Sequence, residues 1–123
     1  MITIGTRYVS TTVVGAHNTA RELGSGDLEV FATPAMVALM ENAAMKAVAP
    51  FLAEGETTVG SEMNCTHTAP SPLGAEIEAE AVVESVEGRK VVFAVEARCG
   101  EQLIGQGRHT RYVVNVAKFL AKL

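Results

Sequence analysis

The hydrophobic period of this chain changes at Pro50, and that change constrains the fold more than any other feature. From Ala35 to Ala49 the apolar residues recur with the helical period of 3.6, and after Pro50 they alternate with the period of 2 of a strand. Neither an amphipathic helix nor an alternating sheet leaves its apolar face in water. We therefore expect an α+β fold in which one long helix packs against an antiparallel sheet.

The helix has sequence signals at both ends. Thr33 and Pro34 supply an N-cap residue followed by proline at the first helical position, and no further proline or any glycine occurs before Pro50. At about 100° per residue, one side of the helix is apolar and the other is polar. The apolar stripe contains Val37, Met40, Ala44 and Val48, and the opposite side contains Asn42 and Lys46. Glu41 falls within the apolar stripe, where a carboxylate needs a compensating partner.

Five segments of the chain are typical of strands. They lie within residues 5–16, 58–68, 76–86, 90–99 and 102–114. Residues 17–27 predict a loop, with a helical turn from Thr19. Alternation in 58–68 places His67 on the face of Met63 and Cys65, and Gly60 on the other face. Because no repeat or low-complexity tract divides the chain, we expect a single domain over residues 1–123.

Composition excludes several classes of protein. The 14 Asp and Glu residues outnumber the 10 Lys and Arg residues, which argues against a general nucleic-acid or anionic-membrane binder. Only Cys65 and Cys99 occur, and Met1 to Ile4 lack the features of a signal peptide, so we expect a reduced, cytoplasmic protein. No apolar run approaches the roughly 20 residues that span a bilayer.

Three side chains could carry chemistry. Glu41 is either a base or nucleophile in a dry pocket, or a residue at the helix rim that pairs with an arginine. Thr33 caps the helix in the simplest interpretation, but the same position suits stabilisation of an oxyanion. His67 lies on an apolar strand face, where a histidine is either a hydrogen-bonded core residue or a catalyst.

A metal site is the alternative role for His67. Cys65 shares its strand face, but a zinc site needs three or four ligands, so we predict no metal centre. His17 and His109 are most simply surface residues. The chain also lacks the motifs of nucleotide-binding proteins and serine hydrolases.

Several segments stand in the order and spacing of a known family. They are 24–28, 30–36, 39–41, Val59–Gly60, His67, Gly107 and 109–114. A Thr-Pro pair, a glutamate eight residues after the threonine and a histidine on a later strand resemble the fluoroacetyl-CoA thioesterase family of hotdog proteins. The resemblance covers nearly the whole chain. It implies a single hotdog domain, in which a curved antiparallel sheet wraps a long central helix.

The resemblance also implies an activity and a site. Thr33, Glu41 and His67 fall on the catalytic positions, and Gly60 falls near the substrate, where a missing Cβ lets the thioester approach the backbone. The implied reaction is hydrolysis of a small acyl-CoA to the free acid and CoA. No separate cofactor is implied, because CoA is part of the substrate.

The sequence also predicts a partner and the residues that contact the substrate. The family places its pocket at a dimer interface, so we expect a homodimer with the active site at or near the contact between subunits. The basic pairs available for the CoA phosphates are Arg89 with Lys90 and Arg108 with Arg111, of which we predict Arg108 and Arg111 as substrate-binding residues. The loop around 24–28 resembles the segment that covers the substrate, and the acyl group itself is left open.

Thioester hydrolysis needs an oxyanion donor, a base or nucleophile, and a proton carrier. Thr33, Glu41 and His67 supply these three groups. Eight residues of helix separate Thr33 from Glu41 by about 12 Å along the axis, too far for both to touch one carbonyl. We therefore expect that two subunits combine in the site, or that a substrate atom and water span the gap. A chain of 123 residues is short for an enclosed CoA site, which also favours a dimer.

Two other functions remain compatible with the sequence. A hotdog acyl-CoA hydratase or dehydratase would place a histidine beside the substrate, and the helix contains none. A non-catalytic protein that binds acyl-CoA or a small acid would use Glu41 only to orient its ligand. Product analysis distinguishes the three functions, because only hydrolysis releases free CoA.

Overall fold

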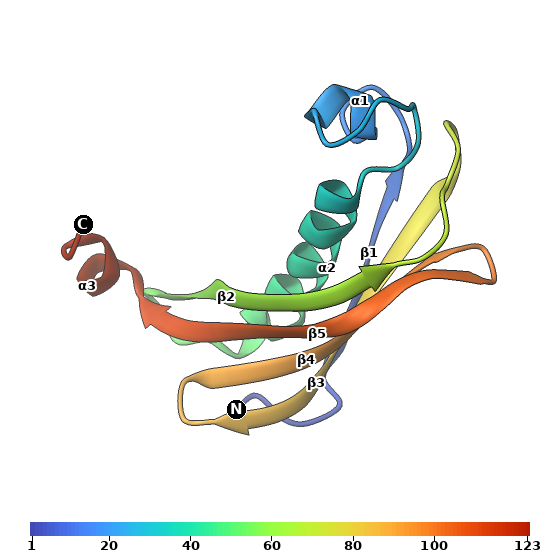
Figure 1. Cartoon of the computed structure of the whole chain (residues 1–123). Helices are drawn as coiled ribbons and strands as arrows, with labels where there is room; N and C mark the ends of the chain where they lie inside the picture. Colours follow the sequence, from blue (N-terminus) through green and yellow to red (C-terminus); the bar gives the residue numbers. More distant parts are fainter.

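The computed structural model describes residues 1–123 and contains one five-stranded antiparallel sheet, one long helix and three short helical segments (Figure 1). The strand order is β1-β3-β4-β5-β2, so β1 and β2 form the two edges. The elements are β1 Arg7–Val13, α1 Ala20–Leu23, α2 Thr33–Val48, the 3₁₀ turn η1 Ala49–Phe51, β2 Glu56–His67, β3 Glu76–Glu87, β4 Lys90–Cys99, β5 Gln102–Asn115 and α3 Val116–Leu120. The predicted α+β architecture is confirmed.

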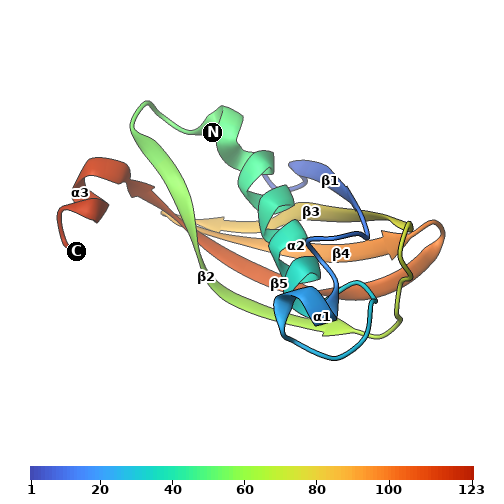
Figure 2. The same ribbon diagram turned by 90° about the horizontal axis from the view of Figure 1, so that it is seen from above.

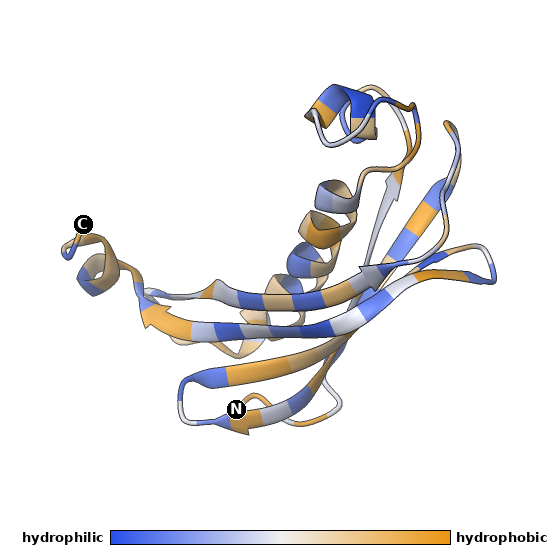
Figure 3. Cartoon of the chain, viewed as in Figure 1, coloured by the Kyte–Doolittle hydropathy of each residue, from blue (hydrophilic) through white to orange (hydrophobic).

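Helix α2 packs against one face of the sheet, which curves around it (Figures 1 and 2). The buried side of the helix consists of Met36, Met40, Ala43, Ala44, Ala47 and Val48. Alternate residues of β3 and β4 face it, among them Ile77, Ala79, Phe93 and Val95, and β4 forms a long apolar run in Figure 3. Full burial of one large aliphatic side chain contributes about 1.5–3 kcal/mol. The helix is therefore held mainly by this apolar contact.

The N-terminus of α2 differs from the sequence-based expectation. Ala32 is the N-cap residue and provides no side-chain cap, so Thr33 is already the first residue of the helix. The predicted capping role of Thr33 is wrong, because its hydroxyl bonds to another element instead. At the other end, α2 ends at Val48 and the chain continues into η1, which contains Pro50. The helix therefore ends just before Pro50, as the sequence predicted.

Strand β2 contains a bulge that its alternation pattern did not reveal. Its pairing with β5 is regular up to Gly60 and again from Glu62, and the register shifts at Ser61 between them. The extra residue reverses the alternation, so Gly60 and His67 both face α2. The prediction that Gly60 lies on the opposite face from His67 is therefore wrong.

The segment between β1 and α2 covers the N-terminal end of α2 (Figures 1 and 2). Thr19 caps α1 by accepting a hydrogen bond from the backbone N–H of Glu22, which confirms the predicted helical turn. An isolated bridge joins Thr19 to Phe31, and the guanidinium of Arg21 donates to the carbonyl of Asp27. These contacts hold the segment closed on itself beside the start of α2.

Helix α3 follows β5 and extends beyond the sheet (Figure 1). Asn115 caps it by accepting from the backbone N–H of Lys118. Phe119 and Leu120 stay exposed and do not pack on the core. None of the helices has the length and apolar character needed to cross a membrane.

Candidate active site

Thr33 and His67 meet at the N-terminal end of α2. Thr33 begins the helix and His67 ends β2. The Oγ1 atom of Thr33 lies 2.8 Å from Nδ1 of His67, a hydrogen-bond distance. Phe31 packs edge-on against the imidazole, with ring centroids 6.4 Å apart. The fold thus brings together two of the three residues that the sequence predicts to be catalytic.

A cavity of about 260 Å³ lies beside this pair and is lined by both residues. Ala20 and Ser25 of the covering segment form one side of it. Residues 68–70, which follow β2, form another side. The loop that resembles the family's substrate cover therefore does border the Thr33–His67 pair.

The surroundings of His67 favour its neutral form. Burial lowers the pKa of His67 because the charged form loses hydration, and the backbone of Ala69 acts more weakly in the opposite direction. Its Nε2 atom is buried and has no hydrogen-bond partner. One ring nitrogen is thus engaged by Thr33, and the other is unpaired.

Glu41 lies two turns further along α2, beside β2 and β5. Its Oε2 atom lies 3.8 Å from Nη1 of Arg111, and its side chain is 41% exposed. A Cβ added at Gly60 would lie 2.8 Å from the same oxygen, so the absence of a side chain there makes room for the carboxylate. The expectation that Glu41 interrupts the buried stripe is wrong. It lies at the rim of the helix and faces an arginine, as the alternative interpretation had it.

The side chain of Arg111 is only 8% exposed, and its guanidinium is held by several bonds. Its Nε and Nη2 atoms donate to the side-chain and backbone oxygens of Thr58 at 2.8 and 2.9 Å. Its Nη1 atom lies 3.1 Å from Nε2 of His109. Burial lowers the pKa of Arg111, and the charge of Glu41 opposes that change. Arg111 is therefore part of the protein interior beside Glu41.

The expectation that His109 is a surface residue is wrong, because it is 1% exposed. Its Nδ1 atom lies 2.7 Å from the backbone oxygen of Glu62, and its ring stacks on Phe93. Burial lowers the pKa of His109 most, the charge of Arg111 lowers it further, and the Glu62 carbonyl and the Glu41 carboxylate act in the opposite direction. Strand alternation was the missed signal, since it places 109 and 111 on one face of the predicted strand.

Arg108 and Arg111 do not form one basic patch. Arg108 is exposed on the face of β5 that points away from α2, and its Nε donates to Glu84 at 2.8 Å. That hydrogen bond raises the pKa of Arg108. The two arginines expected to hold CoA are thus split between the two faces of the sheet, and substrate contact by Arg108 stays a prediction.

The candidate residues fall into two groups within one chain. Thr33 pairs with His67 near the start of α2, whereas Glu41 faces Gly60 and Arg111 further along it. The two groups are separated by about 12 Å of helix axis. Within one chain the two groups are therefore too far apart for both to touch one carbonyl.

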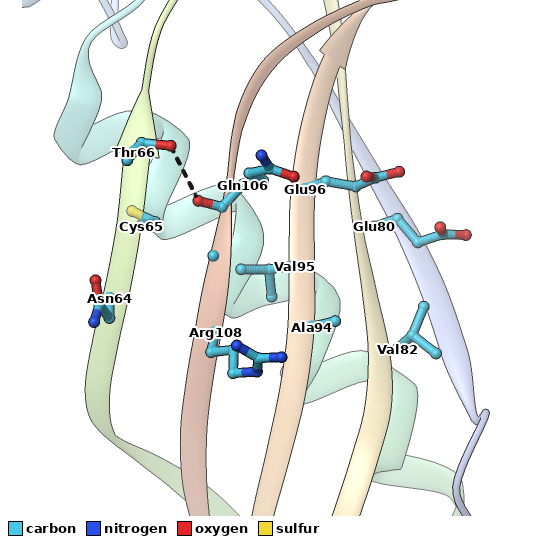
Figure 4. Close-up of a pocket in the computed structure, with 11 residues that line it drawn as sticks. Asn64, Cys65, Thr66, Glu80, Val82, Ala94, Val95, Glu96, Gln106 and Arg108 are labelled. Atoms are coloured by element: carbon cyan, nitrogen blue, oxygen red, sulfur yellow. Dashed lines mark hydrogen bonds between the residues drawn. The ribbon is translucent and has the colours of Figure 1, made fainter.

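A larger cavity, of about 660 Å³, lies on the face of the sheet that points away from α2 (Figure 4). Strands β2 to β5 line it, and it contains none of Thr33, Glu41 and His67. Each of its three charged side chains has an ion-pair partner: Glu80 pairs with Arg7, Glu96 with Arg98 and Arg108 with Glu84. The smaller cavity beside Thr33 is the one that the predicted catalytic residues Thr33 and His67 line.

No three metal-ligating side chains from His, Cys, Asp and Glu converge in the structure. Cys65 and His67 both lie on β2, and no third ligand lies near them. Burial raises the pKa of the Cys65 thiol, which disfavours the thiolate that a metal or a nucleophilic role requires. The residues present thus offer acid, base and hydrogen-bonding chemistry.

Solved structures share the fold, and a thioesterase is among them. A variant of the fluoroacetyl-CoA-specific thioesterase FlK, in complex with fluoroacetate and CoA, superposes with a TM-score of 0.90 at 40% identity, over 96% of this chain and 99% of that one. A hot-dog-like protein from Thermanaerovibrio acidaminovorans superposes with a TM-score of 0.88 at 26% identity, over 97% of this chain and 88% of that one. The fold and the site define a thioester hydrolase of the hotdog class.

The sequence relationships are more specific than the class. The family described as FlK, fluoroacetyl-CoA-specific thioesterase, matches residues 14–117. The fluoroacetyl-CoA thioesterase of Streptantibioticus cattleyicolor is 40% identical, over 98% of this chain and 91% of that protein. The chain belongs to the fluoroacetyl-CoA thioesterase family.

Proposed function

We propose that this protein hydrolyses the thioester of a small acyl-CoA to the free acid and CoA. The observation that carries the proposal is the 2.8 Å contact of Thr33 with His67 beside a cavity of about 260 Å³ at the start of α2. Free backbone N–H groups and the positive end of the helix dipole meet there, and both stabilise an oxyanion. A cavity of this size fits a short acyl group, and the curated relative acts on fluoroacetyl-CoA.

Each residue has a distinct role in the proposed mechanism. The Nδ1–H of His67 donates to Oγ1 of Thr33, which leaves the hydroxyl proton free to bond to the thioester carbonyl oxygen. Glu41 takes a proton from water as that water attacks the carbonyl carbon. When the tetrahedral intermediate collapses, the C–S bond breaks and the proton reaches the thiolate sulfur. Water thus supplies the hydroxyl group of the acid and the proton of the thiol.

We propose that the active enzyme is a homodimer joined through β2. This strand forms an edge of the sheet and pairs only with β5, so its other edge has free N–H and C=O groups. Antiparallel pairing of two β2 strands around a twofold axis near Met63 and Asn64 would place Gly60 of one subunit opposite His67 of the partner subunit. The carboxylate of Glu41 beside Gly60 would then meet the Thr33–His67 pair of the other subunit.

The proposed substrate contacts follow from exposure. Gly60 is open to the site and offers its backbone to the thioester. Arg108 is exposed and positively charged, which suits a CoA phosphate if it leaves Glu84. Arg111 is too buried for that role. A CoA substrate agrees with the cytoplasmic location expected from the composition.

The proposal is tested with a panel of acyl-CoA esters assayed for thiol release. We expect the wild type to release CoA fastest from the shortest acyl chains. The variants Thr33→Ala, Glu41→Gln and His67→Ala should each lose about 100-fold or more in kcat. No thiol release at any chain length would leave a binding protein, and a double-bond product would indicate a hydratase or dehydratase.

A single turnover in isotopically labelled water separates the two roles open to Glu41. General-base catalysis puts the labelled oxygen into the acid during the first turnover and leaves Glu41 unlabelled. Direct attack by the carboxylate expels CoA and forms a mixed anhydride, and water that attacks the Glu41 carbonyl of this anhydride leaves its labelled oxygen on Glu41 and releases an unlabelled acid. Mass spectrometry of the peptide that contains Glu41 measures whether this residue has gained the labelled oxygen.

A further inference from the structure

Hydrogen-bond chemistry fixes the protonation state of His109. Its Nδ1 atom faces the carbonyl oxygen of Glu62, which can only accept, so Nδ1 carries a proton. Its Nε2 atom faces Nη1 of Arg111, which can only donate, so Nε2 must be unprotonated. The arrangement is therefore compatible only with a neutral imidazole in the Nδ1–H tautomer.

This imidazole completes the set of acceptors around Arg111. Thr58 accepts from Nε with its hydroxyl and from Nη2 with its carbonyl, and His109 accepts from Nη1. The same Nη1 atom lies 3.8 Å from Oε2 of Glu41. Since Thr58 and His109 hold the guanidinium from two sides, its direction toward Glu41 is set by the protein interior.

Gly60 shows how closely these groups converge. A Cβ added there would lie 2.8 Å from Oε2 of Glu41, 3.1 Å from Cε1 of His109 and 3.3 Å from Nη1 of Arg111. One carboxylate, one guanidinium and one imidazole therefore surround a single backbone position. The hydrogen bond of His109 to Nη1 of Arg111 connects the imidazole to the guanidinium that faces Glu41.

We propose that His109 is a positioning residue, which acts through Arg111 to hold the carboxylate of Glu41 over Gly60 during thioester hydrolysis. This inference rests on the proposed function. Protonation of His109 would place an Nε2–H against the Nη1–H of Arg111 and would break the contact. The native arrangement thus depends on a histidine that stays neutral.

The surroundings of His109 favour the neutral form. Arg111 on β5 repels a proton on the ring, and Phe93 on β4 covers one face of the ring without charge. Glu41 on α2 is the only carboxylate that acts on it, and Glu62 on β2 contributes its backbone carbonyl. Burial and the charge of Arg111 together outweigh the two opposing effects, so the pKa of His109 lies below its ordinary value.

The first test compares two variants of similar size. In His109→Gln the amide oxygen replaces the Nε2 acceptor, whereas His109→Leu removes it. We expect His109→Leu to lose about 10- to 100-fold in kcat with KM within about twofold, and His109→Gln to keep most of kcat. Equal losses in both variants, or a wild-type kcat in His109→Leu, would overturn the proposal. Far-UV circular dichroism and thermal melting check that both variants fold.

The second test needs neither turnover nor a variant. Two-dimensional ¹H–¹⁵N spectra of the wild-type imidazoles should show the Nδ1–H tautomer of His109 from about pH 6 to pH 8. The Nε–H signal of Arg111 should be protected from exchange with water. An Nε2–H tautomer or a charged ring would overturn the inference whether or not the enzyme is a hydrolase. The expected spectrum without thiol release from any acyl-CoA would overturn only the proposed function.

Discussion

Thr33 is available for chemistry because it does not cap its helix. Ala32 occupies the cap position without a side-chain bond, so the first N–H groups of α2 keep no side-chain acceptor. The hydroxyl of Thr33 turns to His67 instead. An anion that arrives at this end of the helix meets unpaired N–H groups and a hydroxyl with a fixed direction.

This assignment predicts that activity and stability separate at Thr33. Thr33→Val keeps the shape of the side chain and removes its hydroxyl, so kcat should fall about 100-fold while the free energy of unfolding changes by less than about 1 kcal/mol. Thr19→Ala is the matched control, because Thr19 does cap α1. It should lower stability by about 1 kcal/mol. A large loss of stability in Thr33→Val would show that the hydroxyl is structural.

The buried His109 and the half-buried His67 should make stability depend on pH. Burial lowers the pKa of both His67 and His109, so below about pH 6.5 the unfolded chain binds more protons than the native protein. The free energy of unfolding should therefore be highest above about pH 6.5 and should decrease as the pH falls through that value toward the native pKa. Urea unfolding over a pH series, at one protein concentration, measures this slope.

Glutamine variants assign the slope to its source. His67→Gln and His109→Gln remove the group that titrates, so each should flatten the pH dependence between about pH 5 and pH 6.5. If neither substitution changes the slope, the native pKa values of these histidines are not lowered.

At the scale of elements, the bulge in β2 assembles the Glu41 group. The register shift at Ser61 turns Gly60 toward α2, and Thr58 turns inward with it to bind Arg111. Without the extra residue, His67 and Gly60 would lie on opposite faces of the sheet. One inserted residue thus lets both groups face the same helix.

Gly60→Ala tests how tightly that group is packed. The backbone of Gly60 does not have a positive φ, so alanine fits the strand, but its Cβ would lie 2.8 Å from Oε2 of Glu41. We expect displacement of the carboxylate and a loss of about 10- to 100-fold in kcat, with a native circular dichroism spectrum. Gly15→Ala is the control, since its nearest atom would be the Val13 oxygen at 3.9 Å. Equal kcat in both variants would contradict the proposed geometry.

The elements were largely predictable because each depends on local patterns. Each of these signals is carried by neighbouring residues: Thr33 and Pro34 at the start of the helix, Pro50 after its end, and the alternation in 76–86. Thr33 and His67 were also recognisable, since a family resemblance supplied what a lone residue could not. These parts of the prediction needed no knowledge of long-range contacts.

The remaining features depend on partners far away in the sequence. The bulge at Ser61 is defined by register against β5, and Arg111 is buried only because Thr58, His109 and Glu41 satisfy its donors. A segment rich in arginine and histidine indicates a solvated surface until those acceptors are known. The sequence therefore predicted the Thr33–His67 group better than the Glu41–Arg111 group.

For the whole molecule, the separation of the two groups would give the proposed dimer a chemical purpose. Thr33 and Glu41 are fixed on one rigid helix about 12 Å apart, so no side-chain rotation in one chain brings both to a single carbonyl. The edge strand β2 connects the two groups, because Gly60 lies beside Glu41 and His67, further along the same strand, bonds to Thr33. A twofold axis on that edge would create two complete sites from four partial ones.

Mixed dimers of inactive variants test this arrangement directly. Thr33→Ala and Glu41→Gln homodimers each lack one group in both sites and should be nearly inactive. In a mixed dimer, the Glu41→Gln subunit supplies an intact Thr33–His67 pair, and the Thr33→Ala subunit supplies an intact Glu41. One of the two shared sites is then complete, so mixing the variants under conditions of subunit exchange should restore about half the wild-type rate per mixed dimer. Sites built within one chain predict no recovery, because neither subunit then holds both groups, and mixing two samples of the same variant controls for the exchange procedure.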